Sequence, residues 1–252
     1  MSNHQRGIQT VESAGEILAL VCNSPKSLSL SEIAEAMELA PGSAYKYLVS
    51  LLRTGLLKRN ESTLEFEAGS LSLRMGLAKI KNNTLLEHVR ENLTALAEKY
   101  QLNVFASMWS QSNGPTVVFY KQAGGFFHIG FRLGIRLSLH RTASGRVFAA
   151  YMEPDILKAY AENIDQTEYN ELNSLDTKGK LNQIKKLGYS HKVGSPTPGI
   201  SSFAVPVFNA SNEFLMTITA FHNSEIFTIE KEINLIRELK NIAQELKEIQ
   251  HG

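Results

Sequence analysis

Residues 29–56, SLSEIAEAMELAPGSAYKYLVSLLRTGL, contain the signals that decide the fold of the first part of the chain. Ser29 and Glu32 have the spacing of a capping box, in which the hydroxyl accepts from a helix amide and the carboxylate accepts from the amide of the capping residue. Pro41 suits the first position of a second helix, because its missing N–H would otherwise stay unbonded there. Gly55 suits the end of that helix, where positive φ is common. The stretch therefore predicts two short helices joined by a tight turn.

The segments on either side extend this pair to the order helix, helix, helix, hairpin. Val11, Ala14, Leu18 and Val21 have the spacing of one helix face, and the SPKS stretch 24–27 ends that helix. Residues 57–66 alternate into a turn and out again, which is typical of a two-stranded hairpin. The apolar residues expected inside the second and third helices are Ile33, Ala34, Met37, Ala44, Leu48, Leu51 and Leu52. This order is that of a winged helix-turn-helix, although a small interaction domain has the same elements, so the pattern alone leaves both open.

The third helix leaves small, hydroxyl-bearing and cationic side chains off its apolar stripe. Such groups suit the major groove, which admits one helix and is read through hydrogen bonds to base edges. Cations in the hairpin are placed to reach flanking phosphates. The residues predicted to contact double-stranded DNA are Ser31, Ser43, Tyr45, Lys46, Tyr47, Ser50, Lys58 and Arg59. The bulk charge does not add to this prediction, because 26 basic residues face 25 acidic ones.

The second part of the chain predicts an α+β domain. Helical stripes are expected over 85–100, 143–150 and 229–249, and over 168–186 with a break at Lys178-Gly179-Lys180. Strands are expected at 103–109, 115–120, 126–131, 189–193, 203–208 and 214–221. The polar stretch 79–84 is the expected boundary between the parts. We therefore predict two parts, a small helical part with a hairpin before this stretch and a larger α+β part after it, and the α+β part is suited to hold a ligand.

Composition excludes several classes of protein. The single cysteine, Cys22, excludes an internal disulfide framework and is expected in a helix core. No apolar run approaches the ~20 residues of a membrane helix, and the N-terminus has no apolar signal core, so we expect a cytoplasmic protein with no membrane partner. Nucleotide-binding and hydrolase motifs are missing, and His140 has no companion at metal-ligand spacing. We therefore expect neither an enzyme nor a cofactor or metal site.

Five stretches in this order resemble the IclR family of bacterial transcription regulators. The entry segment 7–11 (GIQTV), the first reading-unit helix at 30–34 (LSEIA), and 41–48 (PGSAYKYL) followed by 52–56 (LRTGL) resemble its DNA-binding domain. Residues 134–146 (GIRLSLHRTASGR) are similar to its "LPLHxTASGK" pattern. Leu187-Gly-Tyr189 followed by 199–207 (GISSFAVPV) is similar to its "GY … G(V/I)xxxAxPV" spacing. The resemblance implies a winged helix-turn-helix DNA-binding domain over 1–70, a linker helix over 71–83 and a GAF-like effector-binding domain over 84–252.

The resemblance also implies partners and a pocket. Family members bind operators as dimers or tetramers and respond to small organic acids, so we expect a carboxylate effector and an inverted-repeat operator. Carried over to this chain, the pocket residues are Ile129, Ala143, Ser144, Ser202, Thr217 and Thr219. The residues themselves agree with this, because Ser144 and Gly145 begin a helix whose free amides favour a carboxylate. Thr217 and Thr219 alternate along one strand, so both face the same side, although threonine is also simply common in strands.

Departures from the family pattern set the remaining hypotheses. Residues 190–198 (SHKVGSPTP) contain no acid where the family commonly has one, so Lys192 is predicted to attract an anionic effector; a solvated loop lysine is the alternative. Arg132, Arg136, Arg141 and Arg146 are irregularly spaced and are expected to be mostly solvated. Gly42 and Tyr47 stand where the family often has basic residues, which predicts a different base preference. They also keep open a ligand-binding or assembly module that has lost specific DNA binding.

Overall fold

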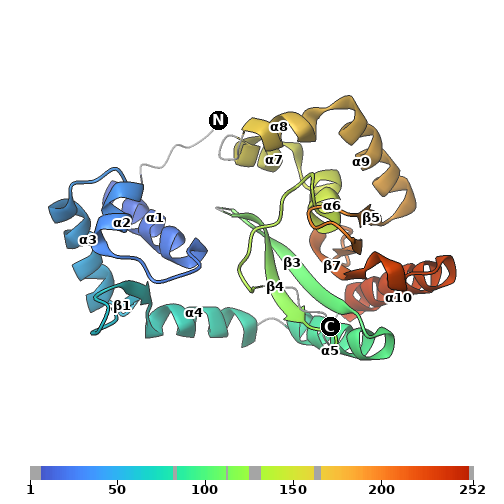
Figure 1. Cartoon of the computed structure of the whole chain (residues 1–252), viewed down its shortest axis with the longest axis horizontal. Coiled ribbons are helices and arrows are strands. Elements are labelled where there is room, and N and C mark those ends of the chain that lie inside the picture. Colours follow the sequence, from blue (N-terminus) through green and yellow to red (C-terminus); the bar gives the residue numbers. More distant parts are fainter. Residues whose placement is uncertain (1–6, 82–83, 112, 125–131, 162–165, 250–252) are drawn as a thin grey trace. The chain divides into compact units, whose positions relative to one another are not determined.

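A computed structural model describes residues 7–81, 84–111, 113–124, 132–161 and 166–249 (Figure 1). The chain divides into two compact units, Met1–Asn83 and Thr84–Gly252. Each unit has its own hydrophobic core. None of the helices described in these ranges is long and apolar enough to cross a membrane.

The N-terminal unit is a winged helix-turn-helix. Helices α1 (Gln9–Asn23), α2 (Leu30–Ala36) and α3 (Pro41–Arg53) are followed by the antiparallel strands β1 (Leu57–Arg59) and β2 (Phe66–Ala68) and by α4 (Ser70–Lys81). The predicted capping box forms, because the Ser29 amide donates to Glu32 Oε2 at 2.8 Å and the Glu32 amide donates to Ser29 Oγ at 3.2 Å. Pro41 is the first residue of α3, and Gly55 follows this helix with φ +74°.

The buried face of α1 differs from the predicted one. Ile17 and Val21 are buried, whereas Val11 is 66% exposed, so the expected stripe was wrong at its first residue. Val11 lies at the first turn of α1, before the part of the helix that packs on the domain core. The prediction that Cys22 belongs to the core was also wrong, because this side chain is exposed.

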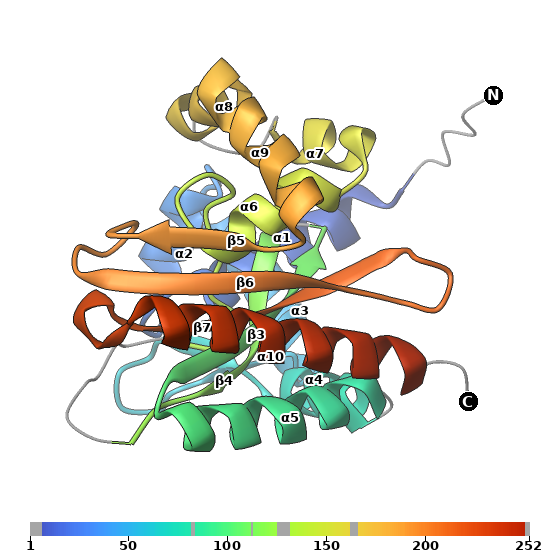
Figure 2. The same cartoon turned by 90° about the vertical axis from the view of Figure 1, so that its right-hand side faces the viewer.

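The C-terminal unit is built on a five-stranded antiparallel sheet in the order β4-β3-β7-β6-β5. The strands are β3 (Asn103–Ser110), β4 (Gly114–Lys121), β5 (Ser190–Val193), β6 (Ile200–Phe208) and β7 (Phe214–Asn223). Helices α5 (Thr84–Tyr100) and α10 (Ile229–Glu248) cover one face, and a short 3₁₀ helix, Ser224–Ile226, precedes α10. Helices α6 (Ala143–Tyr151), α7 (Pro154–Ala161), α8 (Gln166–Asn173) and α9 (Leu175–Leu187) lie on the other side (Figures 1 and 2). The predicted α+β class is thereby confirmed.

Strand alternation gives the two faces of the sheet different chemistry. Val104, Ala106, Ile218, Ala220 and Val205 pack in the core with residues of α5 and α10. The alternate residues face α6 instead, and they are largely polar or aromatic: Phe105, Ser107, Thr217, Thr219, Phe221 and Ser202. This second face therefore carries the residues from which a site can be built.

Two predicted details of this unit need correction. The helix expected over 168–186 is two helices, α8 and α9, and the break lies at Ser174 rather than at Gly179. Ser174 caps α9 because its hydroxyl accepts from the Thr177 amide at 3.2 Å. Helix α7 was not expected. The strand predicted at 126–131 lies outside the described residues.

Candidate functional sites

The exposed side of α3 carries most of the residues predicted to contact DNA. Ser43, Tyr45, Lys46 and Ser50 are exposed along this helix, and Ser31 is exposed on α2. The Ser50 hydroxyl donates to the Lys46 carbonyl at 3.1 Å, so its donor is occupied within the helix. Tyr47 is half-buried and packs against the domain core, which distinguishes it from the other predicted contacts.

The two hairpin cations already have partners within the wing. Lys58 Nζ lies 2.9 Å from Glu67 Oε1, and both side chains are exposed, so this ion pair is weak and exchangeable. Arg59 Nε donates to the Leu64 carbonyl at 3.0 Å, and the guanidinium lies 5.6 Å from the Phe66 ring centroid. Arg59 therefore holds the hairpin turn and presents its remaining N–H groups from a fixed position.

A cavity of about 370 Å³ lies between the polar face of the sheet and the segment that enters α6. Its apolar walls come from Phe105, Ile135, Leu137, Pro196, Ile200 and Phe221. Its polar residues are Arg136, Ser138, Arg141, Thr142, Ser144, Ser195, Thr197, Ser202 and Thr219, and Ala143 completes the lining. An apolar volume with a few polar groups at defined places is typical of a small-molecule site.

Of the six predicted pocket residues that the structure describes, four line this cavity and two do not. Ala143, Ser144, Ser202 and Thr219 are in the lining. Thr217 is instead fully buried beneath it. Ile129 lies outside the described residues. Lys192 is not in the lining, although it pairs with Ser202 across β5 and β6 and so lies on the same face of the sheet.

Thr217 belongs to a buried triad of hydroxyls. Ser107 Oγ lies 2.7 Å from both Ser144 Oγ and Thr217 Oγ1, and Ser144 Oγ lies 2.6 Å from Thr217 Oγ1. All three residues are fully buried, and the triad ties the start of α6 to β3 and β7. The sequence predicted that the Thr217 hydroxyl contacts the ligand. In the structure it bonds within the triad, so its role is structural.

The polar end of the cavity is the N-terminus of α6. Thr142 caps this helix, and its hydroxyl accepts from the Gly145 amide at 2.8 Å. Ala143 and Ser144 occupy the first two helical positions, whose amides have no intrahelical acceptor. A Cβ on Gly145 would lie only 2.0 Å from the Ser138 carbonyl oxygen, so glycine is required for the close approach of this segment to the helix. The geometry offers free N–H groups and a positive dipole end to an anion.

Arg141 adds a formal positive charge at the same end. Its side chain is exposed and lines the cavity, and its carbonyl accepts from the Ser195 hydroxyl at 2.9 Å. Within the described residues, no carboxylate lies within ion-pair distance of the Arg141 guanidinium. Arg141 is thus exposed, as expected from its spacing, and it also lines the cavity.

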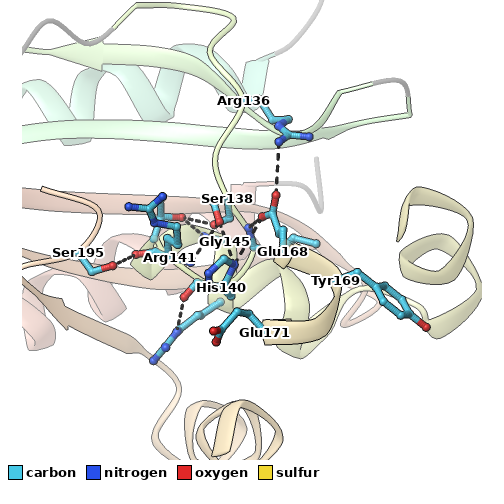
Figure 3. A network of polar contacts seen from close by, with 12 residues as sticks. Arg136, Ser138, His140, Arg141, Gly145, Glu168, Tyr169, Glu171 and Ser195 are labelled. Atoms are coloured by element: carbon cyan, nitrogen blue, oxygen red, sulfur yellow. Dashed lines mark hydrogen bonds and ion pairs between the residues drawn. The ribbon is translucent and has the colours of Figure 1, made fainter. Parts of the chain in front are cut away.

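A buried carboxylate holds the wall formed by residues 135–138 (Figure 3). Glu168 of α8 is 8% exposed; its Oε1 accepts from the Leu139 amide at 2.7 Å, and its Oε2 lies 3.4 Å from Arg136 Nη2. Arg136 also donates to the Tyr160 hydroxyl at 3.2 Å. Arg136 is thus bonded to α8 and α7, although its side chain stays largely exposed, as expected from its spacing.

His140 lies beside this carboxylate as a structural residue. Its Nδ1 lies 3.9 Å from Glu168 Oε1 and 3.3 Å from Ser138 Oγ, and its carbonyl accepts from Arg146 Nε at 2.8 Å. Burial lowers the pKa of His140, and the nearby Glu168 charge only partly offsets this. The ring is therefore neutral at pH 7. Among the residues described, no group of three or more potential metal ligands comes together.

Lys192 belongs to a cationic neighbourhood rather than to the cavity lining. Its side chain is half-buried, and burial is the main cause that lowers its pKa. The charges of Arg146, Lys180 and Arg141 lower this pKa further. Because Lys192 is outside the cavity lining, it is not placed for direct contact with a ligand bound there.

Sequence reasoning missed the aromatic and cationic parts of the lining. Phe105 and Phe221 lie on β3 and β7 with ring centroids 5.8 Å apart, and Ile200 begins β6. Their common face follows from strand alternation only once the register of three strands is known. Arg141 had a local signal, because it immediately precedes the capping residue of α6.

Models of known protein families match both units of the chain. Residues 78–248 match the model of the C-terminal domain of the bacterial transcriptional regulator IclR, and residues 10–61 match the IclR helix-turn-helix domain. The HTH-type transcriptional regulator BhcR of Paracoccus denitrificans is 28% identical over 212 residues, which are 82% of this chain and 75% of BhcR.

Solved structures share the fold at low identity. A putative IclR-type regulator from Silicibacter sp. is 18% identical with a TM-score of 0.84 and covers 96% of each chain. An IclR homologue from Microbacterium hydrocarbonoxydans, complexed with 4-hydroxybenzoate, is 13% identical with a TM-score of 0.72. That comparison covers 96% of this chain and 99% of the homologue.

Proposed function

The chain belongs to the IclR family of transcription regulators, and we propose that it binds an inverted-repeat operator and responds to a small carboxylate in the cavity beside α6. Residues 1–70 read the DNA, 71–83 form the linker and 84–252 sense the ligand. The observation that carries this proposal is the meeting of a 370 Å³ apolar cavity, a free helix N-terminus and the Arg141 guanidinium. Such a protein acts in the cytoplasm, where its operator lies.

The acid fits the cavity by charge and by shape. Its carboxylate lies against the amides of Ala143 and Ser144 and accepts from Arg141, whose planar guanidinium suits bidentate contacts. Its apolar body fills the space between Phe105, Phe221 and Ile200. The IclR homologue complexed with 4-hydroxybenzoate supports a carboxylate of this size in a domain of the same fold.

The operator is read by α3 and held by the wing. Lys46 and the wing cations Lys58 and Arg59 contact phosphates, while Ser43 and Tyr45 face the base edges. One DNA-binding domain covers one half-site of the operator. A dimer or a dimer of dimers therefore needs half-sites about 10 bp apart, or a multiple of this distance. The exposed Leu73 and Leu77, one turn apart on α4, support pairing of the linker helices of two copies.

Binding of the acid and binding of the operator are thermodynamically linked. If the acid binds better to one arrangement of the dimer than to another, it changes operator affinity by the same factor by which the operator changes affinity for the acid. A coupling of 1–3 kcal/mol, typical of allosteric proteins, corresponds to roughly 5–150-fold.

The test is fluorescence anisotropy with the purified full chain and labelled DNA from upstream of its own gene. Specific affinity should fall steeply with salt, and Lys46→Ala should reduce the slope of log affinity against log salt by about 1. A ligand found in a thermal-shift panel of aliphatic, sugar-derived and aromatic carboxylates should then change the operator affinity.

Variants separate the parts of the proposal. Arg141→Ala should weaken ligand binding, while Lys185→Ala, an exposed cation on α9 outside the cavity, should not. Lys192→Ala tests the remaining sequence hypothesis. Salt-independent DNA binding would contradict the operator role and favour an assembly module. Ligands that bind equally well without a carboxylate would contradict acid sensing.

A further inference from the structure

Among the residues that the structure describes, one buried hydroxyl in the cavity lacks a hydrogen-bond partner. Thr219 lies on the central strand β7, is 1% exposed and lines the cavity. Across the described residues, its Oγ1 meets no donor or acceptor. Most buried side-chain polar atoms in proteins are bonded, so an unbonded one inside a cavity indicates a partner that enters with a ligand.

The neighbouring hydroxyl triad restricts what that partner can be. Each hydroxyl has one donor and two acceptor sites. The mutual contacts of Ser107, Ser144 and Thr217 close a ring of three, and each contact requires one O–H donor. All three donors are therefore consumed inside the triad. Ser144, the member that lines the cavity, offers only an acceptor site to a ligand.

We infer that the ligand carries, besides its carboxylate, a hydroxyl that donates a hydrogen bond to Thr219 Oγ1. The ligand class is thus a small hydroxy acid with an apolar or aromatic body. Thr219 is the residue that distinguishes it from the corresponding acid without the hydroxyl. This inference rests on the proposed function, because it assumes that the same cavity binds the acid.

The polar groups of the cavity fall into two sets with complementary requirements. The α6 amides and Arg141 are donors and take the anionic group. Ser144 Oγ has only acceptor capacity left, and Thr219 has both kinds, so a second carboxylate would find no donor at Ser144 Oγ. The aromatic side chains of Phe105 and Phe221 lie next to Thr219 on the same face, since Phe105 is opposite Thr219 in the β3–β7 register.

The first experiment compares Thr219→Val with Thr217→Val in the full chain without ligand. Valine matches threonine in shape and removes the hydroxyl. Thr219→Val should raise the melting temperature of the C-terminal unit by about 2–4 °C, because it removes an unbonded buried hydroxyl. Thr217→Val should lower it, because it breaks two bonds of the triad. A Thr219→Val protein that is less stable than wild type would show that this hydroxyl is satisfied and would overturn the inference.

The second experiment is calorimetric titration with matched acids: benzoate against 3-hydroxybenzoate and 4-hydroxybenzoate, and hexanoate against 6-hydroxyhexanoate. At least one hydroxy acid should bind wild type about tenfold more tightly than its parent acid, as expected for one net hydrogen bond. The preference should fall to threefold or less in Thr219→Val, whereas Arg141→Ala should weaken both members of the pair.

The outcomes separate this inference from the proposed function. Equal binding of parent and hydroxy acids to wild type, or a preference that survives in Thr219→Val, would overturn the inference and leave acid sensing intact. No binding by any acid would overturn both. Loss of the preference in Thr219→Val together with loss of affinity in Arg141→Ala would support both.

Discussion

Replacement of Glu168 by alanine should lower the free energy of unfolding of the C-terminal unit by about 2–4 kcal/mol. The carboxylate accepts from the Leu139 amide at 2.7 Å and lies 3.4 Å from the Arg136 guanidinium (Figure 3). The segment that it anchors supplies four residues to the wall of the cavity: Ile135, Arg136, Leu137 and Ser138. The substitution therefore tests whether α8 supports the ligand site.

The magnitude follows from the burial of each contact. A buried hydrogen bond to a charged acceptor contributes about 1.5–3 kcal/mol, and the Leu139 amide is left without its acceptor in the alanine variant. The Arg136 side chain is 40% exposed, so solvent reduces its ion pair with Glu168 to about 0.2–1 kcal/mol. Glu168→Gln keeps an oxygen at the Leu139 amide and should lose only about 1 kcal/mol.

The assay is urea unfolding monitored through Trp109, the single tryptophan of the chain. Trp109 lies on β3 and packs against Tyr160 with ring centroids 5.0 Å apart, so its fluorescence reports on the C-terminal unit. Glu171→Ala, an exposed carboxylate on the same helix, is the matched control and should change stability by less than about 0.5 kcal/mol. A Glu168→Ala protein as stable as wild type would refute the reasoning. A glutamine variant as unstable as the alanine variant would show that the ion pair, rather than the Leu139 amide, dominates.

Three further predictions concern packing and pH. Gly145→Ala should destabilise the C-terminal unit by about 1–3 kcal/mol in the same urea assay, because the added Cβ would lie 2.0 Å from the Ser138 carbonyl oxygen. Gly179→Ala in α9 is the control and should be neutral or stabilising, because its added Cβ would meet no atom within 4 Å among the described residues. Burial lowers the pKa of His140, His191 and His222 below 6.5, so the folded unit binds fewer protons than the unfolded chain. The stability that is present above pH 6.5 should therefore be lost as the pH falls. A urea midpoint of unfolding that is unchanged between pH 7 and 5 would contradict this. The ion pair with Lys26 and the bonds to Ser29 lower the pKa of Glu32 to about 2, so its contribution should be complete above pH 4.5 and lost as the pH falls towards 2. The stability difference between wild type and Glu32→Gln, measured by circular dichroism, should therefore shrink over that range, and a constant difference would count against it.

The elements of the DNA-binding unit were predictable because their signals are local. The Ser29–Glu32 capping box and the helix-initiating Pro41 each involve residues within one helical turn, and both act as predicted. The error at Val11 shows the limit of this reasoning. Periodicity marks an apolar stripe, but the burial of each residue depends on where the neighbouring helices end, which is a tertiary property.

The break between α8 and α9 shows two local signals in competition. Gly179 suggested a helix end, yet a glycine with open space around it costs a helix only about 1 kcal/mol. Ser174 supplies a capping hydroxyl for the Thr177 amide and starts a new helix there. The helix therefore breaks at Ser174, whose side chain forms a capping hydrogen bond, and continues through Gly179, which only weakens it.

The cavity was predictable only in part, because its lining depends on register. The residues that follow one another in the chain, Ala143 and Ser144, could be placed by the start of α6. The residues that converge from β3, β6 and β7 could not, since a shift of one residue in any strand would turn its side chains to the opposite face. Thr217 and Thr219 face the same side of the sheet, yet their hydroxyls differ. The Thr217 hydroxyl is bonded within the triad, whereas the Thr219 hydroxyl has no partner among the described residues.

Arg141 and Lys192 are the two candidates for direct contact with the carboxylate of the acid, and their positions relative to the cavity distinguish them. Both are cations near the same end of the sheet, and the charge of Arg141 itself contributes to the lowered pKa of Lys192. Lys192 is outside the cavity lining, so it adds to the positive potential without contacting the ligand directly. Arg141 lines the cavity, adjoins the free amides of α6 and has a planar guanidinium that suits bidentate contacts with a carboxylate. The acid should therefore be held by Arg141 and attracted, at longer range and more weakly in salt, by Lys192.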